Sequence, residues 1–168
     1  MDHDVYRVLF LSRRNSARSI LAEAVLNREG KGQFEAHSAG VEVASAIDPR
    51  IADLLKAEGL SVPDLRPKHY SEFAAEGAAD LDFVFTLSDT AIGEPLPEWP
   101  GMPISAHWSL ADPLKVEGSE WEKKAAFARN LAELQRRIRV FISLPFASLD
   151  RMSLKRHVDE IGGQANAG

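Results

Sequence analysis

The stretch VLFLSRRNSARSILAEA (residues 8–24) contains a hydrophobic strand, a short polar loop and the start of an amphipathic helix. Residues 6–11 are apolar or aromatic except for Arg7, which is typical of a strand buried on both faces. Beyond the loop, apolar residues recur at the spacing of one helix face, with Ser16 as the expected N-cap and Gly30 as the expected stop. The chain is therefore predicted to begin with a strand–loop–helix unit.

The rest of the sequence alternates predicted strands and helices. Strands are predicted at residues 34–40, 81–87 and 102–108, and helices at residues 48–59, 119–144 and 149–161. Asp48 and Pro49 supply the N-cap and the first-turn proline of the second helix in the chain. Residues 61–80 predict a long irregular connection, and a helix that starts near Ser88 must end by Pro95. This alternation predicts an α/β fold with a parallel sheet of about four strands, covered on both sides.

The length and composition indicate a single domain. The 168 residues are 45% hydrophobic, and we expect one domain over residues 1–162, followed by a frayed tail at residues 163–168. No stretch is apolar enough to cross a membrane, and the opening residues lack the basic and apolar regions of an export signal. We therefore expect a cytoplasmic protein with no membrane partner. The formal net charge of -5 argues against a general nucleic-acid partner.

The sequence contains no cysteine. Disulfides, thiolate metal sites and thiol redox chemistry carried by this chain are therefore excluded. We expect no metal site and no cofactor, and any redox chemistry would have to be supplied by another molecule.

The loop after the first strand is a candidate binding site for a tetrahedral oxyanion. Ligands of parallel α/β sheets bind beyond the carboxyl ends of the strands. Backbone N–H groups at a helix start, the helix dipole and a guanidinium group together favour an oxyanion there. The candidate oxyanion-binding residues are Ser12, Arg13, Arg14, Asn15, Ser16, Ala17, Arg18 and Ser19. The alternative interpretation is a capped helix with solvated arginines.

The motif HWSLADP places Asp112 just beyond the fourth predicted strand, at the same edge of the sheet as this loop. A carboxyl group at that position could act as a general acid. The alternative is a turn or helix-capping residue before Pro113, as the other Asp-Pro pair at Asp48 illustrates.

The chain resembles the low-molecular-weight protein tyrosine phosphatases, and more closely the thioredoxin- or glutaredoxin-linked arsenate reductases that share their fold. The resemblance spans nearly the whole length, in the motifs FLSRRNSARSILAEA, HSAG, TLSDTAIGEPLPEWPG, AHWSLADP and SLDRMSLKRHVDEIG. It implies a three-layer α/β fold, with helices flanking a four-stranded parallel sheet in the strand order 2-1-3-4.

The resemblance also implies roles for individual positions. Ser12 occupies the place of the catalytic cysteine, Arg18 that of the arginine that clamps the oxyanion, and Asp112 that of the general acid. Asn15 and Ser19 match the residues that hold the loop and stabilise a thiolate. In the related reductases, further cysteines relay a disulfide to the redox partner, and Ser88 and Leu96 stand at the corresponding places in this sequence.

A serine at position 12 separates binding from catalysis. The reference pKa of a cysteine thiol is about 8.5, and a helix start with nearby cations can lower it, whereas a serine hydroxyl is a far weaker acid. The loop contains no histidine to act as a base, and we interpret His37 and His107 as packing or capping residues. Backbone amides and Arg18 do not depend on sulfur, so oxyanion binding can persist without thiol chemistry.

The loop also carries Arg13 and Arg14, where members of the resembled family have smaller residues, often glycine. The two arginines either recruit a more highly charged ligand or point into water. A positive φ at Arg14 would be costly for a non-glycine residue, so we expect a rearranged loop. Because Leu96 and the two arginines also depart from the pattern, we interpret Ser12 as natural divergence and not as a laboratory substitution.

Three functions fit the sequence. The first is a relative of arsenate reductase that lacks thiol catalysis and binds a small tetrahedral oxyanion or a phosphorylated ligand. The second is a weakly active phosphatase or a disabled variant of an arsenate reductase. The third is a protein-interaction module with a vestigial pocket, whose candidate surfaces are RPKHY (residues 66–70) and WPGMP (residues 99–103).

Overall fold

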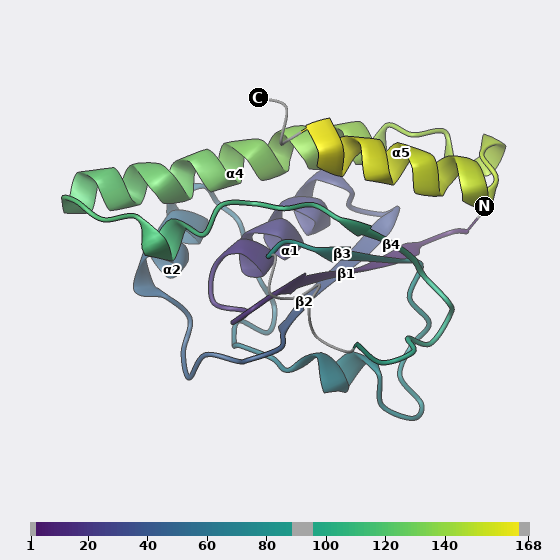
Figure 1. The fold of residues 1–168 in the computed structure, drawn as a ribbon, viewed down its shortest axis with the longest axis horizontal. Coiled ribbons are helices and arrows are strands. Elements are labelled where there is room, and N and C mark those ends of the chain that lie inside the picture. The colour runs from purple at the N-terminus through teal and green to yellow at the C-terminus, as the bar shows by residue number, and fades with distance from the viewer. Residues whose placement is uncertain (1–2, 89–95, 165–168) are drawn as a thin grey trace.

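Four parallel strands form the central sheet of the computed structural model, which describes residues 3–88 and 96–164 (Figure 1). The strands are β1 (Tyr6–Ser12), β2 (Phe34–Gly40), β3 (Phe83–Thr86) and β4 (Ile104–His107), in the order β2-β1-β3-β4. In the register of β1 with β2, Ser12 lies opposite Gly40 at the carboxyl end of both strands. The predicted parallel sheet and its strand order are confirmed.

Helices pack mainly on one face of this sheet (Figure 1). They are α1 (Arg18–Glu29), α2 (Pro49–Ala57), α4 (Glu120–Ile142) and α5 (Arg151–Gln164). The opposite face is covered by the 3-10 helix Tyr70–Phe73 and by Leu96 and Trp99. The sheet therefore lies between two layers. None of the described helices is long and apolar enough to cross a membrane.

Strand β1 is buried on both faces because its side chains alternate between two cores. Val8 and Phe10 belong to the large core between the sheet and the helices. Leu9 and Leu11 belong to a smaller core on the other face. This alternation explains the continuous apolar run that predicted a buried strand.

Local sequence signals mark the starts of α2 and α4 but not the start of α1. Asp48 caps α2 by accepting a hydrogen bond from the Arg50 amide, and Ser119 forms a capping box with Glu122 at the start of α4. The prediction that Ser16 caps α1 is wrong. The N-cap is Ala17, whose methyl group has no atom that could cap the helix, and the carbonyl of the preceding Ser16 accepts from the Asp48 amide at 3.4 Å.

The observed elements differ in length from several predictions. Strands β3 and β4 are shorter than predicted at both ends, and α5 continues to Gln164, two residues into the predicted tail. Residues 165–168, and the part of the predicted Ser88–Pro95 helix at residues 89–95, lie outside the described residues.

A buried arginine fixes the chain that leads from β4 toward Asp112. Arg137, in the C-terminal third of α4, is 2% exposed. Its guanidinium donates to the Trp108 carbonyl at 2.8 Å and to the Ser109 carbonyl at 2.8 Å. Burial lowers the pKa of Arg137, and the hydrogen bond to Glu133 opposes this shift. The two bonds attach the edge of the sheet to α4.

We predict that Arg137→Ala lowers the free energy of unfolding by about 2–4 kcal/mol, because two charge-assisted hydrogen bonds to backbone carbonyls are lost. Arg136→Ala is the matched control, since Arg136 pairs with the same Glu133 but lies at the surface. Arg136→Ala should lower the free energy of unfolding by less than about 1 kcal/mol. Urea unfolding measures both values, and equal losses would contradict the role assigned to Arg137.

Candidate functional site

The loop between β1 and α1 turns its carbonyl groups outward. The Arg13 carbonyl accepts from the amides of Val41 and Glu42 at 3.0 and 2.8 Å, and the Arg14 carbonyl accepts from the Ala44 amide at 3.0 Å. The C=O and N–H groups of a trans peptide unit point in opposite directions, and the structure contains no cis peptide bond among the described residues. The amides that follow these carbonyls, those of Arg14 and Asn15, therefore point away from residues 41–48.

Ser12 lies at the inner end of this loop and is 2% exposed. Its Oγ accepts a hydrogen bond from the Asn15 amide at 3.2 Å and lies 2.6 Å from Ser19 Oγ. Ser19 Oγ in turn accepts a bond from the Asn15 side-chain amide at 2.8 Å. The hydroxyl of Ser19 can therefore donate to Ser12, which leaves the Ser12 hydrogen free to donate to a ligand.

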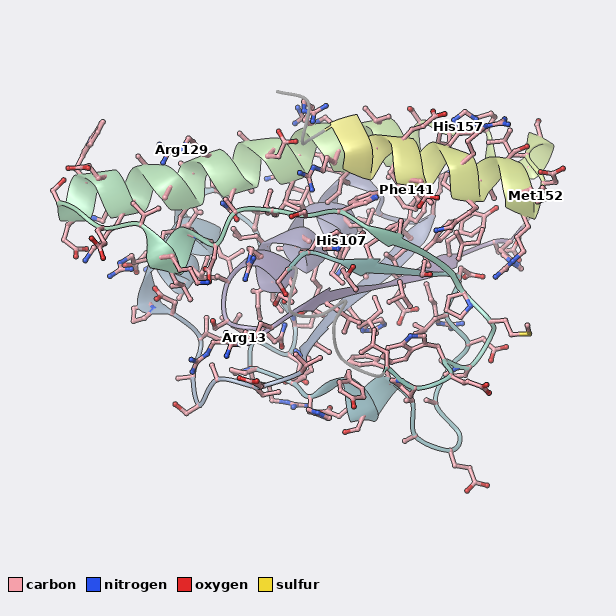
Figure 2. All side chains as sticks on the ribbon, in the orientation of Figure 1. Arg13, His107, Arg129, Phe141, Met152 and His157 are labelled. Carbon is pink, nitrogen blue, oxygen red and sulfur yellow. The ribbon has the colours of Figure 1, made fainter. Side chains whose placement is uncertain are left out.

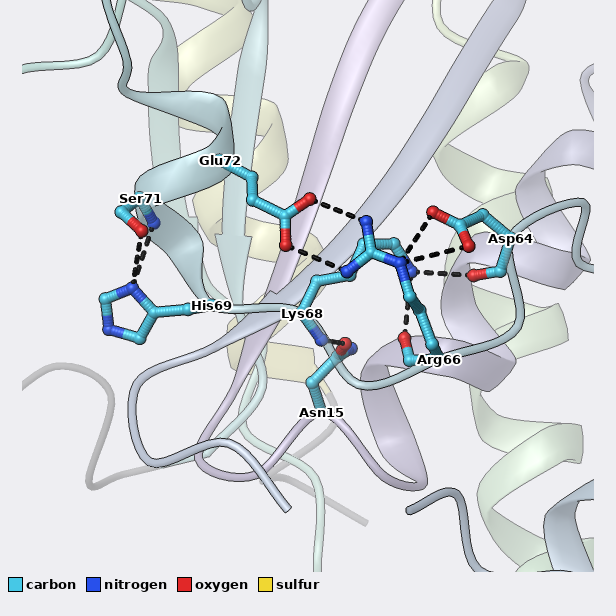
Figure 3. Close-up of polar contacts among 7 residues, drawn as sticks. All are labelled: Asn15, Asp64, Arg66, Lys68, His69, Ser71 and Glu72. Carbon is cyan, nitrogen blue, oxygen red and sulfur yellow. Dashed lines mark hydrogen bonds and ion pairs between the residues drawn. The ribbon is translucent and has the colours of Figure 1, made fainter. Parts of the chain in front are cut away.

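Asn15, and not Arg14, adopts the left-handed backbone conformation in this loop. Its φ is 50°, whereas Arg14 has no positive φ and so avoids the cost that a non-glycine residue would meet there. Asparagine tolerates this conformation better than most residues. The buried Asn15 side chain also accepts a hydrogen bond from the Lys68 amide at 2.7 Å (Figure 3).

The segment from Asp64 to Glu72 supports Asn15 through the Lys68 amide (Figure 3). Arg66 binds both carboxylate oxygens of Glu72, at 2.9 and 2.7 Å, and also contacts Asp64. The hydrogen bond from Arg66 lowers the pKa of Glu72. The Lys68 ammonium donates to the Asp64 and Arg66 carbonyls at 2.9 and 3.0 Å. Sequence reasoning missed this support, since residue 68 is 53 positions from Asn15.

The HSAG motif fits beneath the same loop. A Cβ atom on Gly40 would lie 2.9 Å from the Asn15 amide and 3.0 Å from the Arg13 carbonyl, so only glycine allows this approach. Ser38 donates to the buried carboxylate of Glu23 on α1 at 2.7 Å, and burial raises the pKa of Glu23. The motif therefore ties β2 to both the loop and α1.

Arg18 connects the loop to the predicted acid. Its guanidinium donates to the Leu110 carbonyl at 2.9 Å and lies 3.6 Å from Asp112 Oδ2. Asp112 Oδ1 also accepts from the Leu114 amide and caps the 3-10 helix Pro113–Lys115. Both interpretations of Asp112 are therefore compatible with its geometry, because one oxygen caps a helix and the other faces Arg18.

A single hollow of about 440 Å³ brings most of the predicted site together. It is lined by Ser12, Arg13, Arg14, Asn15, Ser16, Ala17, Arg18, Ser88, Ser109, Leu110, Ala111, Asp112, Leu114 and Lys115. Ser19 acts behind this surface through Ser12. Ser88, at one of the positions matched to a relay cysteine, is buried, and its Oγ has no hydrogen-bond partner among the described residues. Leu96 instead packs against the smaller core.

The two histidines considered as bases do not line this hollow. His107 Nδ1 lies 2.7 Å from Thr86 Oγ1, and His37 Nε2 lies 3.1 Å from Glu35. In Figure 2, His107 lies at the end of β4, whereas Arg13 lies lower and to the left. Among residues 3–88 and 96–164, no group of three or more His, Asp or Glu side chains could hold a metal ion.

The fold and the site define an α/β protein with a loop-and-arginine pocket at the carboxyl edge of its parallel sheet. The chain belongs to the low molecular weight phosphotyrosine protein phosphatase family, whose sequence model matches residues 7–156. The resemblance predicted from the sequence motifs is therefore confirmed.

Arsenate reductases are among the similar proteins. The arsenate reductase of Halalkalibacterium halodurans is 30% identical over 134 residues, which cover 80% of this chain and 93% of that protein. The crystal structure of arsenate reductase from Archaeoglobus fulgidus superposes with a TM-score of 0.65 at 28% identity, covering 82% of this chain and 99% of that one. A low molecular weight protein tyrosine phosphatase from T. tengcongensis shares the fold, with a TM-score of 0.62 at 24% identity, covering 80% of this chain and 95% of that one.

We predict that Asn15→Gly lowers the free energy of unfolding by about 2 kcal/mol, because two buried side-chain hydrogen bonds are lost while the positive φ is still tolerated. Asn15→Ala should cost about 1 kcal/mol more, because alanine also resists the left-handed conformation. Urea unfolding of the two variants separates these effects. An alanine variant as stable as the glycine variant would contradict the backbone argument.

Proposed function

We propose that the protein binds a small tetrahedral oxyanion, or a phosphorylated ligand, in the pocket and does not carry out thiol-dependent catalysis. The observation that carries this proposal is the presence of Ser12 at the inner end of the loop beside Arg18, in a sequence without cysteine. The ligand would meet the inward amides of the loop, the Ser12 hydroxyl and the Arg18 guanidinium.

The hydrogen bonds around Ser12 support a loss of catalysis. Two donors can converge on Oγ, the Asn15 amide and the Ser19 hydroxyl, which is an arrangement that would stabilise a thiolate. A serine hydroxyl stays protonated at neutral pH in the same surroundings, and no histidine among the described residues lines the pocket to remove its proton. Ser12 is therefore a hydrogen-bond donor in this account, and not a nucleophile.

Arsenate reduction by this chain is disfavoured more strongly. A serine ester of arsenate offers no sulfur atom to give up an electron pair and form a disulfide. The positions matched to the relay cysteines are Ser88 and Leu96, which cannot carry a disulfide to a redox partner. Any reductant would have to act on the bound arsenate directly.

The two alternatives make different demands on the site. A weakly active phosphatase requires Asp112 to protonate a leaving group. Asp112 lines the pocket, and its Oδ2 lies 3.6 Å from the Arg18 guanidinium.

A protein-interaction module requires exposed surfaces. RPKHY is a poor candidate because Lys68 is buried and Arg66 is paired, whereas Met102 in WPGMP is 79% exposed. We place the protein in the cytoplasm, as the sequence predicts.

We predict that calorimetry detects binding of phosphate, sulfate and arsenate at millimolar concentration, with a matching rise in melting temperature. Arg18→Lys should weaken phosphate binding at least about tenfold, because a lysine cannot reproduce charge-assisted bonds from a planar fork. Arg28→Lys, at the far end of α1, is the control and should bind as the wild type does. Absence of heat and of a thermal shift in the wild type would overturn oxyanion binding.

We predict that Ser12→Cys gives measurable hydrolysis of an aryl phosphate, which the wild type lacks, because a thiol at position 12 can ionise while Arg18 and Asp112 are already in the pocket. Adding Asp112→Asn to Ser12→Cys should reduce that rate by about a hundredfold or more, the usual contribution of a general acid. Wild-type turnover that disappears in both Asp112→Ala and Arg18→Ala would instead establish the weakly active phosphatase.

A further inference from the structure

The mouth of the pocket carries more positive charge than one bound oxyanion needs. Four cationic side chains line the hollow, together with the single carboxylate of Asp112. Arg18 faces Asp112, and Arg13 pairs with Glu42 at 3.0 Å. Among the residues that the structure describes, no ion pair involves the exposed side chains of Arg14 and Lys115. Two positive charges at the mouth are therefore available to a ligand.

These two cations come from separate parts of the chain. Arg14 belongs to the loop that follows β1, and Lys115 ends the 3-10 helix that begins just after Asp112. Asp112 caps that short helix, and Asn130 of α4 donates to the Ala111 carbonyl at 3.2 Å. The backbone that carries Lys115 is therefore held beside the pocket. Lys115 also lines an adjoining hollow, whose other lining residues include Arg50 and Lys123.

The size and lining of the hollow also exceed the needs of a single anion. Its volume of about 440 Å³ falls within the range of pockets that hold whole small molecules, which are larger than one tetrahedral anion. None of the described residues that line it is aromatic, so no ring is present to stack on an aromatic group of a ligand. The excess volume is accompanied by positive charge and hydroxyl groups.

We propose that the ligand is diphosphate-like: one phosphate-type group occupies the loop beside Ser12 and Arg18, and a second anionic group lies between Arg14 and Lys115. This inference rests on the proposed oxyanion binding and specifies the class of ligand. The unusual Arg13 and Arg14 of the loop then have different roles, because Arg13 is neutralised by Glu42 while Arg14 contacts the ligand.

The test compares calorimetric titrations of inorganic phosphate and inorganic pyrophosphate at constant ionic strength and pH. Pyrophosphate should bind the wild type about tenfold more tightly, as expected for two added exposed ion pairs. Arg14→Gln and Lys115→Gln should each reduce this preference by about two- to fivefold, and the double variant should nearly abolish it. Phosphate affinity is measured in every variant, so that each preference is the ratio of the pyrophosphate affinity to the phosphate affinity of the same protein.

Arg129→Gln is the control for a general loss of positive charge, because Arg129 lies on the outer side of α4, far from the edge that carries Arg13 (Figure 2). It should leave the preference within about twofold of the wild type. Equal affinities for the two anions in the wild type, or a preference that survives the double variant, would overturn this inference while leaving oxyanion binding intact. Failure of both anions to bind would instead overturn the proposed function itself.

Discussion

The carbonyl groups of Arg13, Arg14 and Ser16 accept hydrogen bonds from amides in residues 41–48, and the site depends on this outward orientation. Because these carbonyl groups point outward, the amides that follow them point inward, and the Asn15 amide donates a hydrogen bond to Ser12 Oγ. Glycine at position 40 lets β2 approach closely enough for this arrangement. The proposed anion pocket is thus built largely from backbone groups, whose hydrogen bonds to residues 41–48 do not involve the side chain at position 12.

The remaining contacts hold this loop against the rest of the molecule. On one side, the Asn15 side chain accepts a hydrogen bond from the Lys68 amide. On the other side, the Arg18 guanidinium donates to the Leu110 carbonyl. Arg137 fixes the carbonyls just before Leu110 from within α4. The supports come from four separate segments, so the binding half of the site is expected to survive changes that remove its chemistry. In our account, Ser12 is such a change.

Much of this arrangement could be predicted from local sequence. The apolar run of β1, the Asp48 cap and the helix start at Ser119 depend on signals within a few residues, and all three predictions are confirmed. The N-cap at Ala17 could not be predicted from local sequence. The Ser16 carbonyl accepts a hydrogen bond from the Asp48 amide, which is more than thirty positions away in the chain. Lys68 and Arg137 were missed for a related reason: each looks like a surface charge until the tertiary fold buries it.

The central claim is that this pocket binds an oxyanion without forming a bond to it. A crystal structure of the wild-type protein grown in phosphate tests it most directly. We predict a tetrahedral anion held by the loop amides and Arg18, within hydrogen-bond distance of Ser12 Oγ and not covalently attached to it. A phosphorylated Ser12, or an empty loop at saturating phosphate, would contradict this account.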